Sequence, residues 1–95
     1  MKRSFLLITA LCCLLTHQAA VAEEFKCLAK DNSKKLHVIL VDTSDIKDAR
    51  RAALASTVNN SFNRPSPVEN VLECKRENEQ FRSPRGRVID GQTAR

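Results

Sequence analysis

The sequence contains neither tryptophan nor tyrosine, and its four aromatic residues are all phenylalanine. Proteins that bind single-stranded nucleic acid stack the bases on aromatic side chains, so the sequence offers little for such a partner. Glycine is also scarce, with two residues, and no glycine-rich segment has the pattern that holds a phosphate group. These absences argue against nucleic acid as a partner and against a phosphate-binding active site.

Residues suited to catalysis or metal binding are few. After the first 22 residues a single histidine remains, His37, and it lies inside an apolar run, which is typical of a packed side chain. No second histidine or nucleophile pattern accompanies it, and scattered carboxylates do not make a set of metal ligands. A domain of this size also has little room for a buried pocket. We therefore expect no enzymatic activity, no cofactor and no metal site.

Long apolar runs are missing except at the start of the chain. Lys2 and Arg3 precede an apolar stretch over residues 4–16, and Ala20-Val21-Ala22 has the small-x-small pattern of a cleavage site. The apolar stretch is too short to span a bilayer as a stable anchor. The pattern predicts a signal peptide over residues 1–22 that is cleaved. The mature protein is then expected to be periplasmic or secreted, with no transmembrane segment.

The predicted cleavage leaves two of the four cysteines. Cys12 and Cys13 lie in the apolar stretch, without the residues that precede a lipid-modified cysteine. Cys27 and Cys74 remain, and in an oxidising compartment one such pair is expected to form a structural disulfide. Closing a loop of this length stabilises a fold by about 4 kcal/mol in the chain-entropy model. A redox-active pair would instead have the close Cys-x-x-Cys spacing, which is absent.

The rest of the chain predicts four elements in the order ββαβ. Residues 25–30 and 36–41 have the composition of two strands joined by a polar turn. Residues 45–59 are rich in alanine and contain neither glycine nor proline, which favours a helix. A loop with Pro65 and Pro67 follows, and residues 68–74 are expected to form the last strand.

The connections and the cysteines together predict the sheet. A right-handed crossover through the helix makes the third strand parallel to the second. If the third strand lies beside the first, Cys27 and Cys74 come within disulfide reach. We therefore predict an α+β fold over residues 23–76. It is a small ββαβ domain, with a three-stranded, mostly antiparallel sheet of order 2-1-3, one covering helix and one disulfide.

Positive charge is concentrated at the C-terminal end. Residues 23–74 carry eight Lys or Arg against eight Asp or Glu, whereas residues 75–95 carry six against three. We expect residues 77–95 to form a basic, loosely ordered tail in which Phe81 docks. Such a tail can remain solvated, or it can order on a partner. In the second case Phe81, Arg82, Arg85 and Arg87 are the candidate binding residues. The outer edge of the second strand is another candidate surface, because an edge strand can accept a partner strand.

Several short motifs resemble a family of small exported proteins of gamma-proteobacteria. They are Lys26-Cys27 after the signal peptide, Glu73-Cys74 on the last strand, Phe81, and the closing Arg87-Val88-Ile89-Asp90 with Thr93. Members of that family are described as accessories of type IV pilus, or type IVa secretion, systems. The resemblance implies that the two cysteines are a structural pair. It also implies a periplasmic, non-enzymatic accessory role.

Three hypotheses about function remain open at this point. The first is an exported accessory protein that binds another protein of the cell envelope, in a type IV pilus or secretion system. The second is a ligand of anionic envelope components, lipopolysaccharide or acidic lipid, through the arginines of the tail. The third is a small periplasmic enzyme inhibitor.

Overall fold

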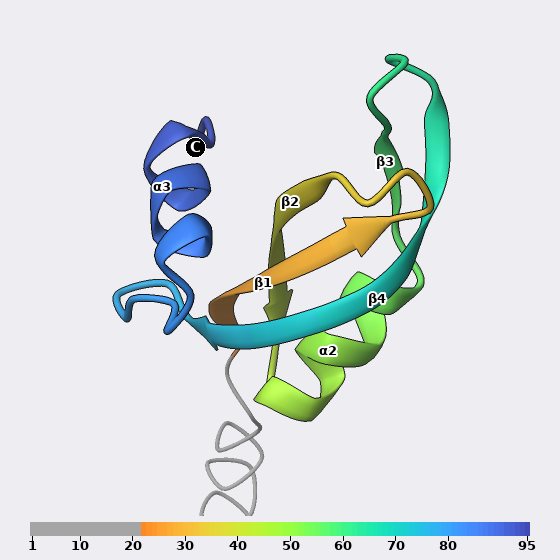
Figure 1. Cartoon of the computed structure of the whole chain (residues 1–95). Coiled ribbons are helices and arrows are strands. Elements are labelled where there is room, and N and C mark those ends of the chain that lie inside the picture. The colour runs from red at the N-terminus through yellow and green to blue at the C-terminus, as the bar shows by residue number, and fades with distance from the viewer. Residues whose placement is uncertain (1–21) are drawn as a thin grey trace, which may run out of the picture.

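The computed structural model describes residues 22–95 and contains four strands and two helices in that range (Figure 1). All but the last residue of the predicted signal peptide therefore lies outside the described residues. No helix of the described part is long and apolar enough to cross a membrane. In chain order the elements are β1 (Glu23–Asp31), β2 (Leu36–Thr43), α2 (Ile46–Leu54), β3 (Thr57–Asn59), β4 (Pro65–Arg76) and α3 (Pro84–Gln92).

The strands form one antiparallel sheet in the order β2-β1-β4-β3. The predicted neighbours are confirmed, since the expected third strand is β4 and it lies beside β1. The predicted number of three strands is wrong, because β3 adds a fourth. The alanine-rich composition predicts a helix that includes residues 57–59. The helix instead ends at Leu54, and residues 57–59 pair with the start of β4. Thr57 and Val58 are β-branched, a shape that favours the extended strand over the helix.

The disulfide between Cys27 and Cys74 is present and joins β1 to β4. The two cysteines are direct cross-strand partners, with Cα atoms 4.0 Å apart. Beyond the disulfide, the register between the two strands shifts at Leu28/Ala29 and again at Lys30/Asp31. Each shift places an extra residue in β4. Because such bulges bend a strand, they account for the pronounced curve of β4 across the molecule (Figure 1).

Helix α2 covers one face of the sheet. The Asp45 side chain caps it by accepting a hydrogen bond from the Asp48 N–H at 2.9 Å. Its small residues Ala49 and Ala53 are fully buried, which lets the helix lie close to the strands. Arg50 lies at the edge of this contact, where its Nη1 donates to the Val71 carbonyl at 2.8 Å.

Strand β1 is buried on both faces. Phe25, Cys27 and Ala29 belong to the core cluster that includes Ala49 and Ala53 of α2. The alternate side chains point to the opposite face, because successive residues of a strand do so. There the Lys26 and Leu28 side chains are also buried, 3% and 0% exposed. A second layer must therefore cover that face.

The second layer is the C-terminal segment, which carries helix α3. We expected residues 77–95 to be loosely ordered, and the structure places a helix over nine of them. Ser83 caps α3 by accepting a hydrogen bond from the Gly86 N–H at 3.1 Å, and Pro84 occupies the first turn. The sequence of α3 has no apolar stripe that would predict a helix packed on a sheet. Its position depends instead on contacts with the β1 residues Lys26 and Leu28.

Candidate functional site

Phe81 holds the C-terminal segment on the sheet. Its side chain is 1% exposed, and the Lys26 ammonium lies 5.3 Å from the centre of its ring. The predicted docking of Phe81 therefore occurs within the protein itself. Since the ring faces the core, Phe81 does not present an exposed anchor to a partner.

Glu73, in β4, fixes the loop between Phe81 and α3. One carboxylate oxygen accepts from the Arg82 N–H at 2.8 Å and the other from the Ser83 N–H at 3.0 Å. Burial raises the pKa of this carboxyl, but the two N–H donors outweigh it and the pKa lies below its usual value. The backbone at Arg82 and Ser83 is thus tied to the central part of the sheet.

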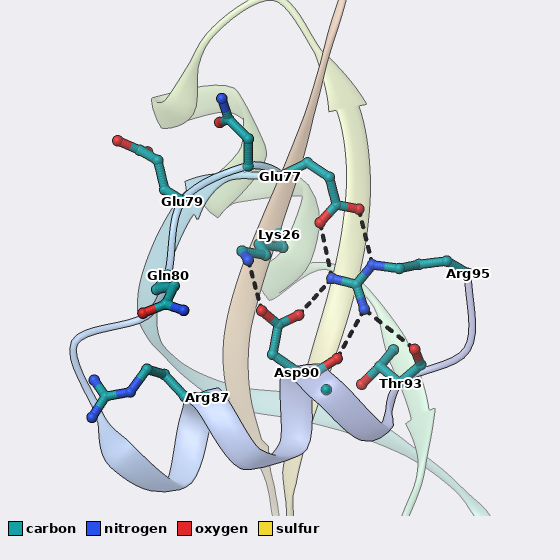
Figure 2. A pocket seen from close by; sticks show the side chains of 10 residues that line it. Lys26, Glu77, Glu79, Gln80, Arg87, Asp90, Thr93 and Arg95 are labelled. Atoms are coloured by element: carbon teal, nitrogen blue, oxygen red, sulfur yellow. Dashed lines mark hydrogen bonds and ion pairs between the residues drawn. The ribbon is translucent and has the colours of Figure 1, made fainter.

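A chain of ion pairs closes the segment from its other end (Figure 2). The buried Lys26 ammonium contacts Asp90 Oδ2 of α3 at 2.6 Å. The other Asp90 oxygen accepts from Arg95, and Arg95 also pairs with Glu77 at 2.9 Å. Four charges from β1, the turn after β4, α3 and the last residue therefore neutralise one another in alternating order.

The charges in this chain shift one another's pKa values. Burial raises the pKa of Asp90, but hydrogen bonds from Lys26 and Arg95 lower it by a larger amount, so the pKa lies below its usual value. The Arg95 guanidinium lowers the pKa of Glu77, and the two carboxylates raise the pKa of Arg95. The shifts of Asp90, Glu77 and Arg95 thus all favour the ionised forms, which suits a structural role for these ion pairs.

These residues line an open depression of about 640 Å³ beside α3. Its charged walls are occupied by the ion pairs just described, so it does not have the apolar lining of a typical small-molecule site. In the described part of the chain, no group of three or more His, Cys, Asp or Glu side chains is placed to hold a metal ion.

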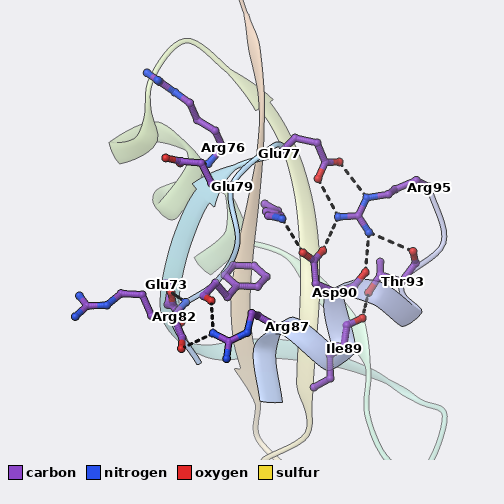
Figure 3. Close-up of polar contacts among 12 residues, drawn as sticks. Glu73, Arg76, Glu77, Glu79, Arg82, Arg87, Ile89, Asp90, Thr93 and Arg95 are labelled. Atoms are coloured by element: carbon purple, nitrogen blue, oxygen red, sulfur yellow. Dashed lines mark hydrogen bonds and ion pairs between the residues drawn. The ribbon is translucent and has the colours of Figure 1, made fainter. Parts of the chain in front are cut away.

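Arg87 also belongs to the internal structure of the segment (Figure 3). Its Nη1 donates to the carbonyls of Phe81 and Arg82, at 3.0 Å each. This arginine thus holds the loop before α3 in shape. Its guanidinium is engaged within the chain, although it was predicted to face a partner.

Arg82 and Arg85 differ from Arg87. Both residues are exposed, and neither side chain makes a hydrogen bond or ion pair within residues 22–95. They lie on the loop before α3 and in its first turn, on backbone that Glu73 and Ser83 hold in place. Arg87 is exposed as well, but its guanidinium is already hydrogen-bonded, so Arg82 and Arg85 are the predicted binding residues whose exposed side chains remain available on an ordered support.

The sequence alone predicted neither of two further features, the hydrogen bonds of buried Asp31 and the exposure of Phe62. Asp31 is fully buried and accepts hydrogen bonds from His37 Nε2 at 2.8 Å, from Ser33 and from the Lys35 N–H. Burial raises its pKa, but these donors together hold it well below the usual range. His37 therefore belongs to the structure of the β1–β2 turn.

The other feature is Phe62, which lies in the turn between β3 and β4 and is 76% exposed. It belongs to no periodic pattern, so no signal in the sequence points to it.

One comparison with known proteins identifies a family. The family model described as "Type IVa secretion system protein TapY2-like" matches residues 5–95. No curated protein and no solved structure matches the chain. The family match confirms the resemblance inferred from the two cysteine motifs and the C-terminal residues. Because it spans nearly the whole sequence, the chain belongs to the TapY2-like family of type IVa secretion system proteins.

Proposed function

We propose that this protein is a non-enzymatic accessory of a type IVa secretion system that acts in the cell envelope by binding another protein. The observation that carries this proposal is the ordered, exposed pair Arg82 and Arg85, on a segment that Phe81 and Glu73 fix to the sheet. Family membership supports the type of machinery. The charged N-terminal residues and apolar stretch that precede Ala22 support export.

The order of the C-terminal segment matters for binding. A loosely held tail loses backbone and side-chain entropy when it orders on a partner, and this loss weakens the complex. Here the backbone at Arg82 is already held by Glu73, so binding needs to order only the two arginine side chains. The planar guanidinium group pairs well with carboxylates in two parallel hydrogen bonds. A complementary acidic protein surface is therefore the partner that this site suits best.

The same two arginines support a second candidate function. Residues 75–95 have six basic against three acidic residues, so the segment could instead attract lipopolysaccharide or acidic lipid. The two functions differ in their response to salt. Attraction to a charged surface falls steeply as ionic strength rises, whereas arginine–carboxylate hydrogen bonds that become buried in a protein interface are screened much less.

The test is a pull-down of the tagged protein from envelope extract at low and at high salt. The variant Arg82→Ala/Arg85→Ala removes the proposed contacts without touching Arg87 or the ion pairs. A matched control, Lys47→Ala/Arg51→Ala, removes the same charge from the exposed side of α2.

We expect one discrete protein that remains bound at high salt, is lost with Arg82→Ala/Arg85→Ala and is retained by the control. Lipid-rich material that dissociates at high salt would favour the second function. Retention of the protein partner by both variants would exclude the arginine pair as its binding site.

A further inference from the structure

The disulfide reveals which way the backbone of β1 faces. In an antiparallel pair, opposed residues that are not hydrogen-bonded have Cα atoms about 4.5 Å apart, and hydrogen-bonded ones about 5.5 Å. Cys27 and Cys74, at 4.0 Å, are of the first kind. The N–H and C=O groups of Cys27 therefore point away from β4, toward Ile39 of β2.

Two hydrogen bonds at the ends of β1 agree with this alternation. Asp31 N–H donates to the Lys35 carbonyl on the β2 side, and Glu77 N–H donates to the Glu24 carbonyl on the β4 side. Odd-numbered residues of β1 thus bond to β2 and even-numbered ones to β4.

The same alternation assigns the backbone groups of β2. His37, Ile39 and Val41 lie opposite odd-numbered residues of β1 and bond to them. The N–H and C=O groups of the residues between them, Leu36, Val38 and Leu40, consequently point away from the sheet. Within residues 22–95, the backbone groups of Leu36, Val38 and Leu40 make no hydrogen bond beyond the β1–β2 ladder, so this edge is open.

Strand β3 has an open edge as well. Val68 N–H donates to the Ser56 carbonyl, and Asn60 N–H donates to the Arg64 carbonyl, so even-numbered residues here face β4. The backbone groups of Thr57 and Asn59 therefore point away from β4. Because β4 is strongly curved, β3 does not continue a flat sheet but lies behind the β1–β2 turn (Figure 1).

The edges of β2 and β3 border one groove, which α3 closes on a further side. Its volume is about 480 Å³, and its lining includes Lys35, Leu36, Val38, Val58, Asn59 and Ile89. Outward-pointing backbone groups from two strands thus border a space whose lining mixes apolar with polar side chains, the latter including His37, Gln92 and Thr93 as well.

Strand β2 also lacks the features that usually protect an open edge. Natural proteins place proline, inward-pointing charges or bulges on such strands, because an exposed edge recruits other strands. Residues 36–41 contain no proline and no lysine, and the pairing of β1 with β2 continues without a register shift. An edge left open in this way is suited to accepting a strand.

We propose that this groove accepts one extended segment of a partner protein, which adds as a strand to the edge of β2. The inference rests on the proposed function, since it takes the partner to be a protein. The walls formed by β3 and α3 favour a single strand over the edge of a second folded copy. Among the side chains that line the groove, that of Lys35 carries a positive charge. The segment is therefore expected to carry alternating apolar side chains and a carboxylate that reaches Lys35.

Proline at position 38 tests the inference directly. Val38→Pro removes one outward N–H and no hydrogen bond to β1, and proline is tolerated on edge strands. Val38→Thr is the matched control, because it keeps the N–H and a similar shape. Lys35→Glu, at an exposed side chain, tests the charge independently should the proline variant fold poorly. Circular dichroism of the purified proteins establishes that each variant is folded.

Photo-crosslinking in the producing cells locates the segment. A benzoylphenylalanine residue replaces Leu36 or Asn59 at the groove, or Lys47 on α2 as a control position. We expect crosslinks from the groove positions alone, to an extended stretch of one protein by mass spectrometry. Val38→Pro and Lys35→Glu should each reduce the crosslink at least tenfold, and Val38→Thr should leave it unchanged.

The inference is overturned if folded Val38→Pro and Lys35→Glu proteins crosslink like the unmodified chain. It is also overturned if the groove positions give no crosslink, or crosslink a second copy of this chain. The pull-down above separates these outcomes from failure of the proposed function. If only the groove is wrong, a discrete partner still co-purifies, and if the function is wrong, none does.

Discussion

Glycine 86 shows how closely α3 approaches the sheet. A Cβ atom at this position would lie 2.8 Å from Leu28 Cδ2 and 3.2 Å from Phe81 Cβ, both in buried side chains. Gly91, in the same helix, has nothing within 4 Å of the corresponding point. Close packing therefore requires glycine at position 86, whereas the glycine at position 91 only weakens the helix.

Alanine at the two glycines should have opposite effects. Gly86→Ala forces Leu28 or Phe81 to move and should destabilise the protein by about 1–3 kcal/mol. Gly91→Ala should stabilise it by about 0.5–1 kcal/mol, because alanine favours the helix. Urea denaturation measures both changes. Equal effects of the two substitutions would show that α3 does not pack on Leu28 as described.

One buried and one exposed phenylalanine, Phe81 and Phe62, provide a second comparison. Phe81→Ala should lower the free energy of unfolding by about 3–5 kcal/mol, since the ring is 1% exposed. Phe62→Ala should change it by less than about 0.5 kcal/mol, since that ring is 76% exposed. Chemical denaturation is again the measurement. A small effect at Phe81 would contradict its place in the core.

At the scale of elements, α3 depends on charge rather than on an apolar stripe. Lys26 is 3% exposed, yet it is paired with Asp90 and lies against the Phe81 ring. An ammonium group so far from water needs such a partner. The sequence could not reveal this pairing, because Lys26 and Asp90 are 64 residues apart and an isolated lysine in a strand usually faces solvent.

Removal of the lysine charge should loosen α3 specifically. Lys26→Met keeps most of the side-chain volume but leaves Asp90 with Arg95 alone. We expect a loss of about 3 kcal/mol, the lower end for breaking a buried pair. Hydrogen exchange should quicken over residues 84–92 more than over β1.

The surface pair Lys34–Glu69 supplies the control for this variant. Its side chains are 72% and 49% exposed, so Lys34→Met should cost at most about 1 kcal/mol. If both variants had the same small effect, the buried pair would not be what holds α3.

At the scale of the whole molecule, four carboxylates share one behaviour. The pKa values of Asp31, Glu73, Glu77 and Asp90 all lie below their ordinary values in the folded protein. Their contribution to stability is therefore complete above the unfolded-state pKa of about 4. It is lost as the pH falls below that value toward the folded pKa values, because the unfolded chain binds protons more readily.

The urea midpoint should consequently stay nearly constant from pH 7 to pH 5 and fall steeply between pH 4 and pH 2. Asp31→Asn should flatten part of this decline, at the expense of stability at pH 7. A midpoint that is independent of pH down to pH 2 would contradict the hydrogen-bonded state of these groups.

The disulfide acts on the whole molecule as well. It joins residues 47 positions apart and so reduces the conformational entropy of the unfolded chain. Cys27→Ala/Cys74→Ala should lower stability by about 4 kcal/mol in the chain-entropy model. Thermal unfolding with and without a reductant checks this, since a reductant should lower the melting temperature of the unmodified protein only.

What the sequence determined by itself is local or covalent in origin. Alternation and alanine content were enough to locate β1, β2, α2 and most of β4, because strand and helix periodicity appear within a few residues. Two cysteines in a chain predicted to be exported were enough to expect the disulfide, and the disulfide then placed β4 beside β1. The cysteine and C-terminal motifs also indicated the family.

Only the tertiary structure decided the rest. The three residues of β3 are a strand because β4 lies beside them, and α3 is a helix on the sheet because Phe81, Leu28 and Lys26 receive it. The roles of the four tail residues also separated there. Phe81 is buried, Arg87 is exposed but hydrogen-bonded to the loop before α3, and Arg82 and Arg85 are exposed with side chains that make no hydrogen bond within residues 22–95. Contacts between residues distant in sequence leave no local pattern, and these contacts determine which side chains remain available to a partner.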